Sequence, residues 1–129
     1  MKIHKTTAKQ ANYPNSLRTI SSPPKVLYFL GASLADLDQR PAVTIVGSRK
    51  VTPYGQRVTT ELTTALAGRN ITIISGLAMG VDAIAHQAAI EAGGRTVAVL
   101  PSRLDKIYPA RNHQLAKNIL THGGTLITE

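Results

Sequence analysis

The first of three short segments whose residue types suit an anion begins with Gly47, Ser48, Arg49 and Lys50 and runs into Pro53. Glycine lets the backbone approach a ligand closely, and a guanidinium and an ammonium group follow it directly. Because cations beside the start of a helix oppose the helix dipole, a bound anion would offset their unfavourable placement. The pattern therefore favours an anion site over an ordinary loop with charged surface side chains.

The second segment is glycine-rich and contains Ser75, Gly76, Leu77, Gly80 and Asp82. Its G-x-x-x-G spacing is that of a loop whose free N–H groups, at the start of a helix, can hold a phosphate. It has neither the G-x-G-x-x-G pattern of dinucleotide-binding loops nor the G-K-[ST] ending of ATP-hydrolysing loops. We therefore expect phosphate binding here, with no NAD or ATP cofactor.

Asp82 and His86 stand four residues apart, a spacing that allows a hydrogen bond on one helix and would suit an oriented general base. Such a pair is more commonly structural, because an acidic residue near a helix N-terminus favours the dipole and a histidine packs inside. No nucleophile with a clear role stands nearby, so we expect no catalytic residue and no enzyme.

The third segment carries Arg103, Lys106 and Arg111 around Tyr108, and ends at Asn112. Basic residues around an aromatic ring suit phosphate contacts with a stacked base, although a solvated loop is the alternative. Asn112 is expected to cap the helix that follows.

The composition narrows the choice of partner. The 129 residues include 15 Lys and Arg against 7 Asp and Glu, a formal net charge of +8. This balance favours a polyanion: nucleic acid, an anionic membrane surface or a phosphorylated metabolite. The chain has no cysteine, and His4, His113 and His122 show no ligand spacing, so no metal site is expected. No segment approaches the roughly 20 apolar residues of a membrane span, so we expect a cytoplasmic protein with no membrane segment.

Short β-branched runs alternate with helical patterns, as in βαβ units. Strands are expected at residues 26–30, 42–46, 71–74, 96–100 and 125–128. Continuous apolar runs of this length are typical of strands buried on both faces in a parallel sheet. Right-handed crossovers are expected to place helices on both faces of that sheet. Because ligands bind beyond the carboxyl ends of such strands, all three segments should meet at one edge.

The first helix is expected after Thr52, its N-cap, with Pro53 in the first helical position. Its apolar face is predicted from the i, i+4, i+7, i+8 spacing of Val58, Leu62, Ala65 and Leu66. Residues 1–25 are expected to form a disordered basic N-terminal arm, with one turn of helix near residues 16–20, and residues 26–129 the folded domain.

Taken together and in order, three motifs resemble those of the DNA-processing protein A family, also called Smf. They are G-S-R with P-Y-G within residues 47–55, S-G-L-A-M-G-V-D with A-H within 75–86, and L-D-K-I-Y-P with N within 104–112. The resemblance implies an α/β fold, a Rossmann-like three-layer αβα sandwich with a mostly parallel sheet. The family's domain continues beyond the point that matches Glu129, so this sequence is expected to cover only the N-terminal part of that domain.

The resemblance also implies a function: binding of single-stranded DNA during natural transformation, loading of the RecA recombinase, and a homodimer with no established catalytic activity. By position, Ser48 and Arg49 would contact a backbone phosphate, and Arg111 matches a basic DNA contact. Ser75, Gly76 and Gly80 would form the second part of the pocket. Arg103 departs from the family pattern, which has glycine there.

Two other functions stay open. Residues 122–129 distantly echo the P-G-G-x-G-T-x-x-E loop of nucleotide phosphoribohydrolases of the lysine-decarboxylase-like group, without its proline and with different spacing. The second open function is that of a passive nucleotide-binding or scaffold domain.

Overall fold

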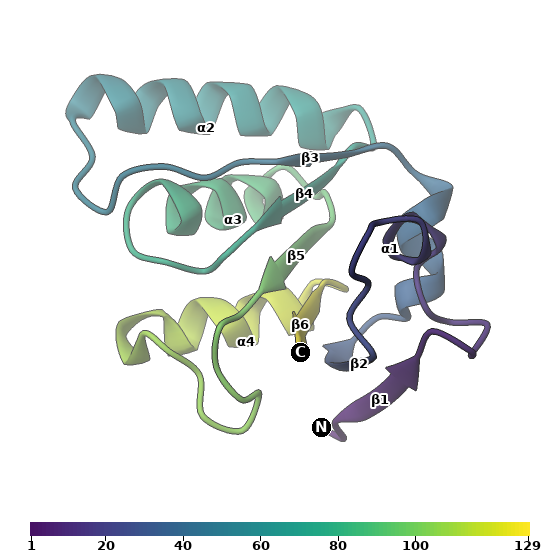
Figure 1. Cartoon of the computed structure of the whole chain (residues 1–129). Helices are drawn as coiled ribbons and strands as arrows, with labels where there is room; N and C mark the ends of the chain where they lie inside the picture. The colour runs from purple at the N-terminus through teal and green to yellow at the C-terminus, as the bar shows by residue number, and fades with distance from the viewer.

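The computed structural model describes residues 1–129, and a six-stranded mixed sheet runs through it (Figure 1). The strands are β1 (His4–Thr7), β2 (Val26–Gly31), β3 (Ala42–Thr44), β4 (Thr72–Ser75), β5 (Thr96–Val99) and β6 (Thr125–Thr128). Their order across the sheet is β1-β2-β6-β5-β4-β3. Strands β3 to β6 are parallel to one another, whereas β2 pairs antiparallel with both β6 and β1. The expected α/β class with a mostly parallel sheet is confirmed.

Three long helices connect the parallel strands: α2 (Pro53–Gly68), α3 (Val81–Glu91) and α4 (His113–Thr121). Shorter helical elements are α1 (Asn15–Arg18) and the 3-10 helices η1 (Leu34–Gln39) and η2 (Ala110–Asn112). Helix α2 begins as the sequence predicts, because the Thr52 hydroxyl accepts a hydrogen bond from the Gly55 N–H and Pro53 occupies the first turn.

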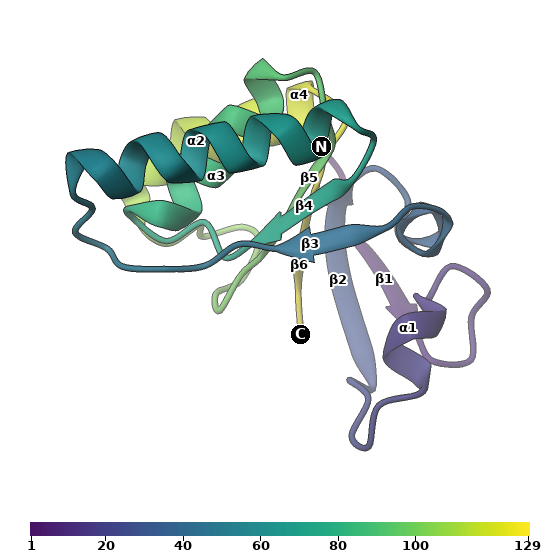
Figure 2. The same ribbon diagram turned by 90° about the horizontal axis from the view of Figure 1, so that it is seen from above.

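The three crossover helices lie on one face of the sheet, not on both (Figure 2). Strands β3, β4, β5 and β6 follow one another in a single direction, and right-handed crossovers then all pass over the same face. On that face Ala98 and Leu126 pack with Ala116 and Ile119 of α4. The other face is covered by smaller parts of the chain: α1, η1 and the segment that contains Tyr13.

A second core cluster forms on that other face, where Val97 and Ile127 pack against Tyr13, Leu27, Phe29 and Leu34. Tyr13 is only 1% exposed, and its hydroxyl donates to the carbonyl oxygen of Pro24 over 2.6 Å. With β1 paired along β2, residues 4–7 and 13 are therefore ordered parts of the sheet and core. The expectation of a disordered arm is wrong, because an antiparallel edge strand needs no long apolar run to pair with its neighbour.

The predicted apolar face of α2 is also wrong. Leu62 is 52% exposed and Val58 38%, whereas Thr59, Thr63 and Ala67 are buried. These small residues allow close approach to the rest of the fold: a Cβ added at Gly94 would lie 2.7 Å from the Cβ of Ala67. Close packing against α3 and β4 thus decides which face of α2 is buried.

Candidate nucleic-acid interface

Three loops meet at the carboxyl edge of the parallel strands, as expected. The first loop (45–52) follows β3, the second (76–80) follows β4, and the third (100–109) follows β5. Parallel neighbours end at the same edge, so residues far apart in the sequence become neighbours here.

The backbones of the first and second loops touch directly. The Val81 N–H donates to the carbonyl oxygen of Ser48 over 3.1 Å. Gly80 has a φ of 87°, and a Cβ added there would overlap that same oxygen and lie 2.7 Å from the Cα of Arg49. Only glycine satisfies both the positive φ and this close approach.

A small hollow of about 80 Å³ opens where the three loops meet. We call it the loop hollow; its lining residues are Arg49, Gly76, Ala78, Met79, Pro101, Tyr108 and Pro109. Its lining thus combines an arginine from the first loop, three residues of the glycine-rich second loop and a tyrosine from the third. The Tyr108–Pro109 peptide is cis.

Several backbone donors at this edge have no acceptor within the protein. They are the N–H groups of Gly47, Ser48 and Arg49 in the first loop and of Ala78, Met79 and Gly80 in the second. Ala78 and Met79 line the loop hollow beside Arg49. Free N–H groups before a helix, together with a guanidinium, suit an anionic ligand.

Four residues expected to bind phosphate are instead buried and engaged within the protein. The Ser75 hydroxyl donates to the carbonyl oxygen of Ile45 over 2.5 Å, and an Asp82 carboxylate oxygen accepts from the Gly76 N–H over 3.1 Å. Asn112 donates its side-chain amide to the carbonyl oxygen of Leu77 over 2.8 Å and makes no side-chain cap for α4. Asp82 and Asn112 thus bond to the backbone of the second loop, and Ser75 bonds to the backbone at the start of the first.

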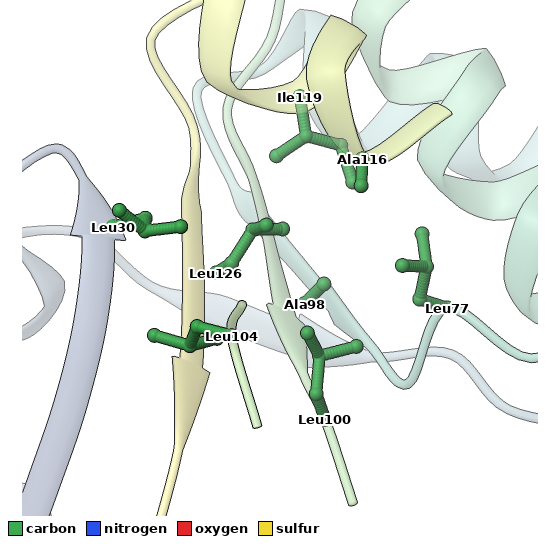
Figure 3. Packing of buried hydrophobic residues seen from close by; sticks show 8 residues of the cluster. All are labelled: Leu30, Leu77, Ala98, Leu100, Leu104, Ala116, Ile119 and Leu126. Carbon is green, nitrogen blue, oxygen red and sulfur yellow. The ribbon is translucent and has the colours of Figure 1, made fainter. Parts of the chain in front are cut away.

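Leu77 is the fourth residue that was expected to bind phosphate and is buried instead. It is fully buried in the cluster beneath α4, together with Ala98, Leu100 and Leu104 (Figure 3). Leu77 therefore offers only its backbone to the loop.

His86 also turns out to support the loop. Asp82 and His86 do not bond to each other, although their spacing allows it. The Leu77 N–H donates to His86 Nε2 over 3.2 Å, and Nδ1 lies 2.6 Å from the Thr96 hydroxyl. Burial lowers the pKa of His86 to about 4, with Asp82 acting in the opposite direction. Sequence reasoning missed Thr96, whose signal was a hydroxyl at the start of an apolar strand.

The cations expected to contact DNA are all exposed, but they are not all brought together. Only Arg49 lines the loop hollow; Lys50 lies next to it in the first loop, and Lys106 and Arg111 lie on the third loop and η2. The two ion pairs of the protein are Arg95 with Asp36 and Arg103 with Asp105. Arg49, Lys50, Lys106 and Arg111 therefore have no acidic partner. The carboxylate of Asp105, 2.7 Å away, balances the charge of Arg103.

The phosphoribohydrolase-like segment lies elsewhere. Gly123 and Gly124 form the turn between α4 and β6, at the amino end of β6, and Glu129 follows its carboxyl end. The Gly124 N–H donates to the carbonyl oxygen of Ile119, and a Cβ at Gly124 would lie 2.6 Å from the Ile119 side chain. Gly124 thus serves packing and Gly123 allows a φ of 81°, both at the edge opposite the loop hollow, and the phosphoribohydrolase alternative is not favoured.

No helix has the length and apolar character needed to span a bilayer. No group of three or more His, Asp or Glu side chains is placed to hold a metal ion.

The fold is that of a Rossmann-like α/β protein, and exposed cations and free backbone N–H groups lie at the carboxyl ends of its parallel strands. The sequence profile of DNA recombination-mediator protein A matches residues 4–129. The chain belongs to this family.

Relatives with curated descriptions agree with this assignment. Protein Smf of Synechocystis is 45% identical over 91% of this chain and 30% of its own length. Protein Smf of Borreliella burgdorferi is 40% identical over 98% of this chain and 41% of its own. DNA processing protein DprA of Bacillus subtilis is 39% identical over 85% of this chain and 37% of its own length. The chain thus spans less than half the length of these relatives.

Two solved structures share the fold. DNA processing protein A from Streptococcus pneumoniae superimposes with a TM-score of 0.84 and 32% identity, covering 98% of this chain and 44% of that one. The corresponding protein from Helicobacter pylori, whose structure concerns its single-stranded DNA binding mode, also gives a TM-score of 0.84 and 32% identity. That match covers 98% of this chain and 55% of the other.

Proposed function

We propose that this chain binds single-stranded DNA through its phosphates at the carboxyl edge of β3, β4 and β5, without covalent chemistry. The observation that carries the proposal is the loop hollow, where Arg49 lies beside the free N–H groups of Ala78 and Met79. The family assignment and the Helicobacter pylori relative indicate which polyanion to expect.

Charge supports a chain of phosphates as the ligand. The net charge is +8, and four exposed cations around the edge lack an acidic partner. Phosphate contacts of this kind supply affinity that does not depend on base sequence and weakens with salt. Tyr108, 61% exposed at the rim of the loop hollow, offers one ring on which a base can stack.

Binding without catalysis is supported by how the polar side chains are used. The buried pair Asp82 and His86 holds backbone N–H groups, and the Ser75 hydroxyl is donated to a carbonyl oxygen. None of them is left as a base or nucleophile facing the loop hollow.

The biological role we propose is that of the family: DNA uptake in natural transformation and RecA-dependent recombination in the cytoplasm. Contact with RecA and assembly into a homodimer rest on family membership alone. Sedimentation of the chain with and without oligonucleotide, and co-sedimentation with RecA, would test them.

The direct test of DNA binding is fluorescence anisotropy with labelled oligo-dT at two salt concentrations and a duplex of equal length as control. We expect Arg49→Ala to weaken binding about fivefold to tenfold and to reduce the salt slope by about 0.7. Arg69→Ala is the matched control, because Arg69 is an exposed arginine at the end of α2, beside the opposite edge of the sheet. An affinity for oligo-dT that changes neither with salt concentration nor in Arg49→Ala would refute the proposal.

A further inference from the structure

Leu77 holds an unusual backbone conformation at the start of the second loop. Its φ is 61°, in the left-handed region that a residue with a branched side chain adopts at a cost. Two side chains hold it there: His86 accepts from its N–H over 3.2 Å, and Asn112 donates to its carbonyl oxygen over 2.8 Å. With its own side chain locked in the core, the residue is restrained from three directions.

The His86 ring is itself fixed in one protonation state by its partners. The Thr96 hydroxyl donates to the carbonyl oxygen of Ile73 over 3.0 Å, so its oxygen is free to accept. A backbone N–H can only donate, so Nε2 must carry the lone pair and Nδ1 the proton. A chain of hydrogen bonds therefore runs from β4 through β5 and α3 to the N–H of Leu77.

The donors that the loop offers to a ligand come immediately after this fixed residue. Ala78, Met79 and Gly80 have free N–H groups, and the first two line the loop hollow with Arg49. Their directions depend on the backbone torsions of Leu77, because consecutive peptide planes are joined only through those torsions.

We propose that His86 is a positioning residue for the phosphate loop: neutral and buried, it holds Leu77 in its left-handed conformation and so aims the N–H groups of Ala78, Met79 and Gly80 at the ligand. The inference rests on the proposed function. It assigns His86 a role in affinity, through pre-organisation of donors, beyond that of a packed core side chain.

Protonation offers a readout that packing alone would not move. With a proton on both nitrogens, Nε2–H would face the Leu77 N–H, and two donors cannot bond. Among the charged groups on α3 and on the elements packed against it, only Asp82, on α3 itself, acts on the ring; β5 contributes the uncharged Thr96 hydroxyl. Acid should therefore release Leu77.

The test compares two substitutions of His86 in the 129-residue chain, with folding checked by circular dichroism. His86→Leu fills the buried space with an apolar side chain but removes the acceptor. His86→Gln retains a side-chain oxygen able to accept from the Leu77 N–H. We expect labelled oligo-dT to bind about tenfold more weakly to His86→Leu and within about threefold of the original to His86→Gln. His122→Gln, an exposed histidine at the end of α4, is the matched control and should leave affinity unchanged.

Amide NMR provides the second arm. In the unsubstituted chain, the amide resonances of Leu77, Ala78 and Met79 should titrate together with the His86 ring at a midpoint of about pH 4. In His86→Gln this acid transition should disappear. This arm needs no DNA and no His86→Leu protein, so it decides the matter even where that variant does not fold.

The outcomes separate the two proposals. If the unsubstituted chain does not bind oligo-dT, the proposed function fails, while the amide titration still tests His86. If it binds and Arg49→Ala weakens it, but folded His86→Leu binds equally well, the role of His86 is overturned. The same holds if His86→Gln binds no better than His86→Leu, or if the loop amides ignore the titration of the ring.

Discussion

Gly80 and Ser48 touch backbone to backbone, although 32 positions separate them in the sequence, and this contact joins the first and second loops of the candidate site. The Val81 N–H donates to the Ser48 carbonyl oxygen beside it. The relative placement of Arg49 and the free N–H groups of the second loop depends on this contact.

Gly80→Ala should therefore disturb both stability and binding. The substitution strains a φ of 87° and forces a Cβ into the Ser48 carbonyl group, so we expect a loss of about 2–4 kcal/mol in the free energy of unfolding. Gly93→Ala is the matched control, with a φ of 73° but nothing within 4 Å of the added Cβ, and should cost about 1 kcal/mol. Urea denaturation of both variants measures the difference; equal losses would show that the two loops do not touch as described.

Ser75→Ala tests whether Ser75 contacts a phosphate or supports the loop. The hydroxyl is buried and donates to Ile45, so we expect a loss of about 1–2 kcal/mol in stability. The salt slope of oligo-dT binding should stay unchanged, because no charged or exposed donor is removed. Weaker binding with unchanged stability in urea would instead indicate a direct phosphate contact.

The buried neutral state of His86 should make stability depend on pH. Its pKa is lowered from 6.5 to about 4 on folding, so the unfolded chain binds the proton more readily. The resulting stability is fully present above pH 6.5 and is lost as the pH falls towards 4, with about 2 kcal/mol gone by pH 5. Urea denaturation measures the free energy of unfolding at pH 7.5 and pH 5. Between these two pH values, His86→Gln should lose about 2 kcal/mol less stability than the unsubstituted chain. Identical acid sensitivity in both proteins would contradict the assignment of a neutral, buried ring.

The buried face of α2 is tested by a pair of truncations. Leu62→Ala should cost less than about 1 kcal/mol, because the side chain is 52% exposed. Ile119→Ala, on the fully buried face of α4, should cost about 2–5 kcal/mol. Thermal and urea unfolding compare the two. A large loss at Leu62 would mean that the face predicted from the apolar spacing is the buried one after all.

Local patterns alone determined much of this protein. Short apolar runs, most of them β-branched, placed all five expected strands, and Thr52 with Pro53 placed the start of α2, because strand preference and helix capping act between near neighbours in sequence. The glycines and cations of the three loops were found in the same way. Their meeting at one edge followed from the parallel order of the strands.

Only the tertiary structure decided what each polar side chain does and which surface each element buries. Ser75, Asp82 and Asn112 carry groups equally suited to holding a phosphate or a backbone atom, and their burial selects the second role. The face of α2 and the pairing of β1 likewise depend on neighbours distant in the sequence. Contacts of this kind are settled by packing and by the need to satisfy every buried polar group, neither of which can be computed from spacing along one chain segment.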